Sequence, residues 1–341
     1  MIYLNIYDIS EKAGVSIATV SRVINGSTSV SEKTRTKVLA AIEEYGYTPN
    51  VFARGLGLNT MKTIGIMCAD ASDPYLARAV YYIEQDLRKN NYDSLLSCTG
   101  YNHDVKKNCL ELLLSKRVDA VVLVGSNYVE NNDEKNTYIK KASDTIPIMI
   151  VNGVLNAPNI YSTVCDDHGA IYEITRRFIK SGKKKPIYLY NSNSYSGIKK
   201  LEGFYDAMKD YDIPVSEKNC HFIKSHGIGV HEAEAFVTKI AESGIEFDGA
   251  ITSDDILAAG VLKYAKNKGI SVPDELFVAG YNNFDIAECC EPELTSVDNK
   301  LEAICHHCVA TLMSVFSEEK SVPKNAVFSG EIIERSSTKF I

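Results

Sequence analysis

The chain has 341 residues, of which 45% are hydrophobic and 24% are charged, and its formal net charge is −7. This length is enough for two or three domains, each with its own core, and the composition is that of a globular protein. No stretch approaches the ~20 apolar residues that a membrane span needs, and the chain opens without a secretory leader. Nine cysteines without regular spacing indicate reduced thiols. We therefore expect a cytoplasmic protein that does not contact a membrane.

Residues 6–26 have the pattern of two short helices joined by a tight turn. Asn5 is a suitable N-cap for the first helix, and Asp8 follows at the spacing of a shortened capping box. Gly14 ends this helix because glycine tolerates a positive φ, and Ser16 caps the second helix. The pair predicts a helix-turn-helix, a motif whose second helix reaches base edges in a DNA groove.

The second helix of this pair is predicted to bury one stripe and to expose the opposite face. The buried stripe consists of Val20, Val23 and Ile24. The side chains left facing outward are those of Ile17, Ala18, Ser21 and Arg22. An ordinary helical hairpin would show a similar pattern, so the helix pair by itself leaves that alternative open.

A third helix is predicted after the pair. Its cap is Ser31, its stop is Gly46, and its buried face consists of Val38, Leu39 and Ile42. Three short helices packed on one small core predict a DNA-binding headpiece. Residues 1–60 carry six Lys or Arg and five Asp or Glu, so this region is not strongly basic. We therefore expect phosphate contacts from polar groups, helix N-termini and a few cations, with modest affinity for random DNA.

Residues 47–62 read YTPNVFARGLGLNTMK and follow the headpiece. Pro49 can start a helical turn, but Gly55 and Gly57 each cost about 1 kcal/mol relative to alanine in a helix. A helix this short is marginal in isolation. By composition alone, this stretch is typical of a flexible linker.

Beyond the linker, apolar strands alternate with amphipathic helices. The predicted strands are 63–69, 92–98, 120–125, 147–151, 162–165, 186–190, 220–223, 249–252 and 276–280. The predicted helices are 75–89, 105–116, 169–181, 198–209, 231–243 and 254–268. Repeated βα units predict parallel sheets covered by helices on both faces. Two such halves fit, with connections near 161–164, 291–294 and 321–324.

The runs AGVS, TVSRVING, SVSEKTRTKVLAAIEEYGYTPN and ARGL closely resemble the lactose-repressor/galactose-repressor (LacI/GalR) family. The resemblance continues through the rest of the chain. It implies an all-α headpiece at 1–48, a hinge at 49–61 and a core at 62–341 that is similar to periplasmic binding proteins. The core would comprise two doubly wound parallel-sheet subdomains, one at 62–161 and 293–321, the other at 162–292 and 322–341. It also implies a homodimeric, ligand-responsive transcriptional regulator, more often a repressor, with no enzymatic activity, cofactor or metal.

The resemblance assigns DNA contacts to the headpiece and hinge. We expect Ile17 and Ala18 to contact thymine methyls and Arg22 to contact a guanine edge of a pseudo-palindromic operator. Phosphate contacts are expected from Tyr7, Ser16, Thr19, Ser21 and Asn25. In the family, paired hinge helices form on the operator, and a leucine wedges between base pairs in the minor groove. That leucine is Leu56 here, with Asn50, Ala53 and Arg54 as its neighbours.

The resemblance also implies a cleft for a small carbohydrate-related effector between the two core subdomains, at the carboxyl ends of the strands. The residues expected to line it are Asp73, Tyr75, Asn127, Asn152, Asn191, Lys200, Asp254, Asp255 and Asn282. Each of these polar side chains has an alternative as a helix cap or turn residue, Asp254 in particular.

Three positions depart from the family's sugar-binding pattern. Lys200 replaces the usual arginine, Asn282 replaces the usual aspartate, and the stacking aromatic is missing where Ser225, His226 and Gly227 stand. Lysine is a point charge without arginine's bidentate fork. Lys200 with Lys199 suggests an anionic group, such as a sugar phosphate. A partner protein or a non-sugar metabolite as the controlling effector is the alternative.

Two further patterns are interpreted as structural. Cys305-His306-His307-Cys308 lies on an amphipathic helical run at 301–316, which favours buried core thiols over a zinc site. The sequence contains no GxxxxGK[ST], GxSxG or HExxH motif, so the common enzyme signatures are absent. A binding protein without a headpiece is a rival class, but the N-terminal helices argue against it.

Overall fold

The structure is a computed structural model that describes residues 5–24, 26–47, 60–216, 218–224, 228–319 and 321–341. The chain divides into two compact units, an N-terminal helical headpiece and a larger α/β core. No helix of the described residues is long and apolar enough to cross a membrane.

Three helices form the headpiece: α1 (Ile6–Ala13), α2 (Ile17–Ile24) and α3 (Glu32–Glu44). The predicted capping box is confirmed, because the Asn5 side chain accepts from Asp8 N while the Asp8 carboxylate accepts from Asn5 N at 2.7 Å. Gly14 adopts a left-handed conformation with φ of 57° and ends α1. These local interactions fix the turn between α1 and α2.

The headpiece core is built from Ile9, Val20 and Val38, all fully buried, together with Ala13, Val23, Ala41 and Tyr47. The prediction that Leu39 is buried is wrong, since its side chain is 49% exposed. One residue advances a helix by about 100°, so Leu39 is turned away from Val38, whereas Ala41 and Ile42 return to the buried side. Ala41 takes the place expected of Leu39.

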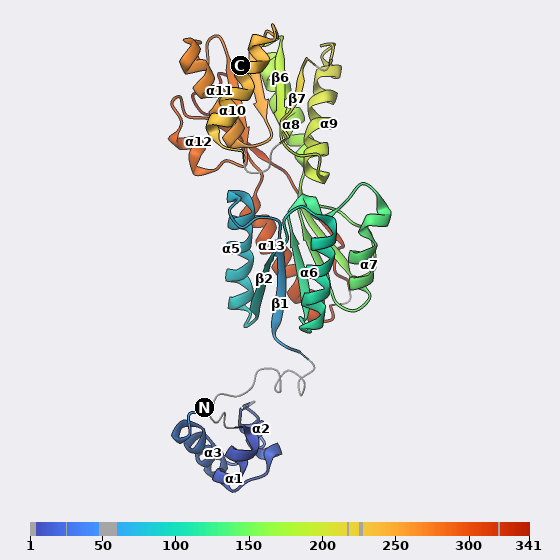
Figure 1. The fold of residues 1–341 in the computed structure, drawn as a ribbon, viewed down its shortest axis with the longest axis vertical. Coiled ribbons are helices and arrows are strands. Elements are labelled where there is room, and N and C mark those ends of the chain that lie inside the picture. The colour runs from blue at the N-terminus through green and yellow to red at the C-terminus, as the bar shows by residue number, and fades with distance from the viewer. Residues whose placement is uncertain (1–4, 25, 48–59, 217, 225–227, 320) are drawn as a thin grey trace. The chain divides into compact units, whose positions relative to one another are not determined.

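The first core subdomain, here called the N-subdomain, is a six-stranded sheet in the order β11-β5-β4-β3-β1-β2. Helices α5 and α13 pack together on one face, and α6 lies on the sheet as well (Figure 1). Its strands are β1 (Thr63–Cys68), β2 (Asp93–Cys98), β3 (Ala120–Val124), β4 (Ile148–Val151), β5 (Ile160–Cys165) and β11 (Asn325–Phe328). Its helices are α5 (Pro74–Lys89), α6 (His103–Ser115), α7 (Thr137–Ser143) and α13 (Leu301–Phe316), with short 3₁₀ turns at Ser126–Tyr128 and Asp133–Asn136.

The second, here called the C-subdomain, is a six-stranded sheet in the order β12-β10-β9-β8-β6-β7. Helices α8 and α9 pair over one core cluster, and α10 and α11 pair over another (Figure 1). Its strands are β6 (Pro186–Tyr190), β7 (Cys220–Phe222), β8 (Gly249–Thr252), β9 (Phe277–Tyr281), β10 (Thr295–Asp298) and β12 (Glu331–Ile333). Its helices are α8 (Asp167–Lys180), α9 (Tyr195–Asp210), α10 (Val230–Glu242), α11 (Asp255–Lys268) and α12 (Asp285–Cys289).

Both sheets confirm the predicted doubly wound parallel architecture. In the N-subdomain sheet, β1, β3, β4, β5 and β11 run parallel. The C-subdomain sheet is parallel except for its edge strand β12, which runs antiparallel to β10. The carboxyl ends of parallel strands meet at one edge of each sheet, where ligands of such folds bind.

The chain crosses between the subdomains three times, each time later than the sequence indicated. The crossings follow β5, β10 and β11, at 166, 299–300 and 329–330, instead of 161–164, 291–294 and 321–324. Strands β10 and β11 are four residues long and β12 three. They carry polar residues and lack the apolar run that marks the interior strands, so sequence periodicity missed them.

The cysteines of the Cys-His-His-Cys run are core residues, as predicted. Cys305 and Cys308 are fully buried on the face of α13 that packs against the N-subdomain core. His306 contacts Asp86, and His307 lies 3.2 Å from the Thr311 hydroxyl. All nine cysteines are free, and the described residues contain no group of three or more metal-binding side chains.

Candidate nucleic-acid interface and ligand pocket

The outward face of α2 carries the residues expected to contact bases. Ile17 is 37% exposed, and Ala18 and Arg22 are exposed as well. Arg22 has no ion-pair partner among the described side chains. Ile17 and Ala18 at the start of α2 are suited to contact thymine methyls, and the exposed Arg22 guanidinium in its last turn is suited to a guanine edge.

The polar residues expected to contact phosphates differ in how exposed their side chains are. The Ser16 hydroxyl caps α2 by accepting from Thr19 N at 3.2 Å, and it lies 2.9 Å from the Thr19 hydroxyl. Tyr7 is 67% exposed on α1, whereas Thr19 and Ser21 are half-buried. Asn25, Asn50, Ala53, Arg54 and Leu56 lie outside the described residues, so their assignments to DNA stay predictions.

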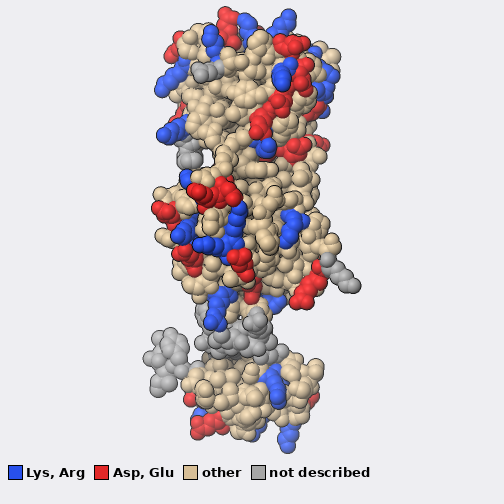
Figure 2. Space-filling view, turned by 90° about the vertical axis from the view of Figure 1, so that its right-hand side faces the viewer, with Lys and Arg blue, Asp and Glu red and all other residues tan. Residues whose placement is uncertain are grey.

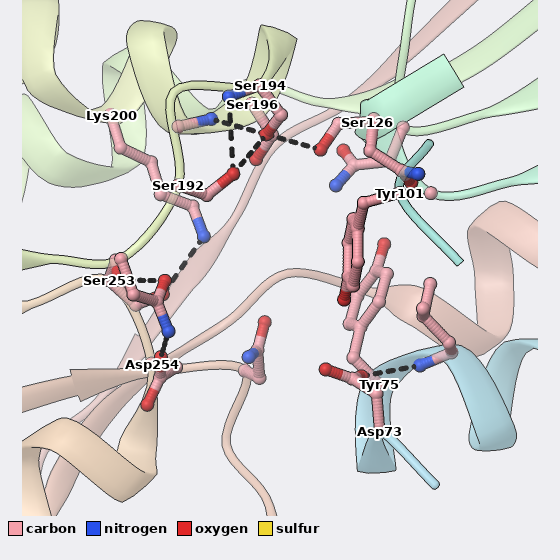
Figure 3. A pocket seen from close by; sticks show the side chains of 17 residues that line it. Asp73, Tyr75, Tyr101, Ser126, Ser192, Ser194, Ser196, Lys200, Ser253 and Asp254 are labelled. Carbon is pink, nitrogen blue, oxygen red and sulfur yellow. Dashed lines mark hydrogen bonds between the residues drawn. The ribbon is translucent and has the colours of Figure 1, made fainter. Parts of the chain in front are cut away.

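In the core, one pocket of about 170 Å³ lies between the two subdomains at the carboxyl ends of their strands. Eight of the nine predicted effector residues line it, namely Asp73, Tyr75, Asn127, Asn152, Asn191, Lys200, Asp254 and Asn282. Figure 3 shows their side chains converging from both subdomains.

The N-subdomain wall presents polar atoms that lack a partner. The Tyr75 hydroxyl, Asn127 Nδ2 and Asn152 Oδ1 are buried and make no hydrogen bond. Buried polar atoms are normally paired, and leaving one unpaired costs about 1–3 kcal/mol. One side of the pocket therefore offers a donor, an acceptor and a hydroxyl, a set suited to a hydroxyl-rich ligand.

The C-subdomain wall is already hydrogen-bonded. Asp254 caps α11 by accepting from Leu257 N at 2.9 Å, and its other oxygen accepts from Asn191 Nδ2 at 2.9 Å. The Ser253 hydroxyl donates to Asn191 Oδ1 at 3.2 Å. Asp73 is likewise the N-cap of α5. Each of the two aspartates therefore caps a helix and also lines the pocket.

Lys200 is 8% exposed, and its Nζ lies 3.1 Å from Ser253 O and 3.6 Å from the centre of the Tyr281 ring. Burial lowers the pKa of Lys200, while the nearby carboxylates of Asp167 and Asp254 favour its charged form. Burial in turn raises the pKa of Asp254. Two carboxylates lie near this one ammonium group. The pocket therefore offers no excess positive charge to a ligand with two negative charges.

The pocket contains a second aromatic side chain besides the predicted Tyr75. Tyr101 lies in the pocket, close to Tyr75 (Figure 3). Tyr101 follows β2 by three residues, at the carboxyl end of the strand, and this position was the signal that sequence reasoning overlooked. The originally expected position, 225–227, lies outside the described residues.

Serines also contribute to the pocket. The Ser126 hydroxyl of the N-subdomain donates to Ser194 Oγ of the C-subdomain at 2.8 Å, and Ser192 donates to the same oxygen at 2.9 Å. Ser196 and Ser253 complete the set. The Ser126–Ser194 hydrogen bond joins the two sides of the cleft directly.

Asp255 is the one predicted effector residue that does not line this pocket. It is 1% exposed and accepts hydrogen bonds from Ser296 and from Phe284 N. Asp254 is the N-cap of α11 and Asp255 is its first residue, and Asp255 lines an adjoining pocket that shares Asp254 and Asn282 with this one.

Burial raises the pKa of Asp255 to about 7. Because the folded chain binds this proton more tightly than the unfolded chain, the contribution to stability is complete below about pH 4 and is lost as the pH rises through 7. We expect the free energy of unfolding of the wild type, relative to Asp255→Asn, to fall by roughly 2–4 kcal/mol between about pH 4 and pH 8. Urea unfolding of both proteins across this range tests it, and a difference independent of pH would contradict it.

Comparisons with known proteins match both parts of the chain. Residues 5–50 match the model for bacterial regulatory proteins of the lacI family, and residues 175–338 match a periplasmic binding protein-like domain. An HTH-type transcriptional regulator of Lachnoclostridium phytofermentans is 50% identical over 99% of this chain and 100% of its own length.

Two solved structures share the fold. The lac repressor dimer bound to operator and the anti-inducer ONPF superposes with a TM-score of 0.86 at 21% identity, covering 98% of each chain. A complex of the transcriptional regulator CelR with cellobiose gives a TM-score of 0.71 at 22% identity, covering 98% of this chain and 99% of that one.

A helix-turn-helix headpiece joined to a two-subdomain ligand-binding core defines a DNA-binding transcriptional regulator, not an enzyme. The chain belongs to the lacI family of bacterial regulatory proteins.

Proposed function

We propose that this regulator is a homodimeric repressor of carbohydrate-related genes, which binds a pseudo-palindromic operator and responds to a small hydroxyl-rich effector in the pocket between its core subdomains. The observation that carries the effector class is the set of buried, unpaired polar atoms on Tyr75, Asn127 and Asn152, three residues that line the pocket together with Tyr101. Since its target is DNA, we place it in the cytoplasm.

The charge balance argues for the kind of effector. Asp73 and Asp254 line the pocket, and Lys200 is its only cation among the described lining residues. We therefore propose that a neutral saccharide binds better than the corresponding sugar phosphate, which carries two negative charges. A thermal-shift comparison of glucose and cellobiose with glucose 6-phosphate tests this, and stabilisation by the phosphate alone would contradict it.

The dimer is supported by an apolar surface on the N-subdomain. Tyr81 on α5 is 58% exposed, and Leu96 on the neighbouring edge strand β2 is 48% exposed. Edge strands and exposed apolar patches are typical of interfaces between chains. On the core face drawn in Figure 2, by contrast, lysines and arginines alternate with acidic residues and form no extended single-sign patch.

Sequencing the DNA captured by the purified chain from a random library, with and without these saccharides, tests the function. We expect a near-palindromic consensus with two half-sites, and enrichment that depends on a saccharide. Capture of DNA without a shared sequence would contradict specific operator binding.

Arg22→Ala should weaken binding to the captured operator by about 1–3 kcal/mol and relax preference at one base position per half-site. The exposed guanidinium on α2 is the physical reason. Fluorescence anisotropy with operators substituted one base at a time measures both effects. If affinity falls equally for every sequence, Arg22 contacts a phosphate.

A further inference from the structure

The loop 282–285 joins β9 to α12 and touches three parts of the core at once. Asn282 lines the ligand pocket, and its Oδ1 accepts from Asn299 Nδ2, in the second crossing between the subdomains, at 2.9 Å. Asp285 accepts from Arg78 of the N-subdomain at 2.9 and 3.0 Å. The Arg78 guanidinium also lies over the Phe284 ring, 5.2 Å from its centre. The loop therefore connects the ligand pocket, the second crossing between the subdomains and the N-subdomain wall of the cleft.

This loop has a backbone conformation that needs support. Asn282 and Asn283 have φ of 96° and 51°, two consecutive non-glycine residues in the left-handed region. Asparagine tolerates this region better than most residues, but such conformations persist only where neighbouring groups hold them.

Asp255 supplies that support from beneath the loop. One of its carboxylate oxygens accepts from Phe284 N at 2.8 Å, and the other accepts from the Ser296 hydroxyl at 2.5 Å. Ser296 Oγ in turn accepts from Asn283 N at 3.0 Å. Two consecutive loop amides are thus held by one carboxylate, directly and through one hydroxyl.

The packing at this point leaves little room for a different arrangement. A Cβ added to Gly280 would lie 2.2 Å from Asp255 Oδ1, so glycine at this position lets the carboxylate approach the strand that leads into the loop. Arg335 Nη2 donates to Asn283 Oδ1 at 2.8 Å from the other side. The loop is therefore fixed between a buried carboxylate and a guanidinium.

We propose that Asp255 is a positioning residue of the effector site, which holds loop 282–285 so that Asn282 faces the pocket and Asp285 pairs with Arg78 across the cleft. This inference rests on the proposed function for its effector part only. Asp255 thus acts on the effector indirectly, through a loop that also contacts both subdomains, and not as a direct ligand contact.

Asp255→Asn is the first test, because it keeps the size of the side chain but replaces one acceptor oxygen with a donor NH₂ group. We expect hydrogen–deuterium exchange of peptides covering 281–286 to become roughly tenfold faster or more, as for a buried amide left without its acceptor. Exchange around Arg78 in α5 should also rise, since its partner Asp285 moves with the loop. Ser296→Ala, which removes one of the two connections, should produce a smaller increase in the same peptides.

Asp248→Asn is the matched control. Asp248 also holds two consecutive backbone amides, those of Lys184 and Lys185, at 2.7 and 2.8 Å, but that loop does not reach the pocket. It should change exchange near 184–185 and leave 281–286 unchanged. If Asp255→Asn leaves exchange of 281–286 as in the wild type, the proposal is overturned.

The effector arm uses cellobiose, lactose and glucose as probes in thermal shift and calorimetry. Asp255→Asn should weaken the saccharide that stabilises the wild type by roughly tenfold or more, whereas Asp248→Asn should not. Faster loop exchange with unchanged saccharide affinity would overturn the role at the effector site. If no saccharide stabilises the wild type, the proposed effector class fails, and exchange at 281–286 and around Arg78 decides the positioning role alone.

Discussion

Val20→Asp is expected to abolish operator binding, with a loss of affinity of at least about a thousandfold, the usual margin of specific over non-specific binding. Val20 is fully buried in the small core that joins α1, α2 and α3. Burying an unpaired carboxylate there costs several kcal/mol, more than a three-helix headpiece of this size can tolerate. Anisotropy with the captured operator measures the loss.

Leu39→Asp is the matched control, because it makes the same chemical change in the same unit at a side chain that is 49% exposed. Its effect on headpiece stability should stay within about 0.5 kcal/mol. Exchange protection of 6–44 should vanish in Val20→Asp and persist in Leu39→Asp, while the core's own thermal transition persists in both. Operator binding by Val20→Asp at wild-type affinity would contradict the headpiece assignment.

Lys200→Met is expected to destabilise the core by about 3–5 kcal/mol, because it leaves the buried Asp167 and the half-buried Asp254 without their nearby cation. It should also remove detectable saccharide binding, since Lys200 lines the pocket. Urea unfolding and calorimetry measure the two effects. The double variant Lys200→Met/Asp167→Asn should regain part of the stability, because it removes one unbalanced charge.

The adjacent Lys199 provides the control. Lys199 forms an exposed pair with Glu202 at 2.7 Å, so Lys199→Met should change stability by at most about 0.5 kcal/mol. Equal stability of Lys200→Met and Lys199→Met would show that the buried charges do not depend on Lys200.

Local signals in the sequence predicted much of this fold. The capping box at Asn5, the left-handed Gly14 and the apolar interior strands depend on residues close together in the chain, and all are confirmed. Strands β10 to β12 were missed because three or four residues are too few to show a periodic pattern. These strands form through pairing with strands that are distant in the sequence.

The pocket was predictable to the extent that strand ends define it. Asn152 follows β4 directly and Asp73 caps the helix after β1, and the topology brings them together. Asp255 lines an adjoining pocket instead, because its carboxylate accepts from Phe284 N and Ser296, and such distant partners cannot be read from the sequence. The bridge between Ser126 and Ser194 depends on how the two subdomains meet, which no local pattern encodes.

The central claim is that occupation of the pocket changes affinity for DNA. The direct measurement is the operator affinity of the full chain with and without a saturating saccharide, paired with the saccharide affinity with and without saturating operator. Linkage requires both to change by the same factor, typically 5- to 150-fold for coupled sites. A saccharide that binds the pocket and leaves operator affinity unchanged would contradict the account.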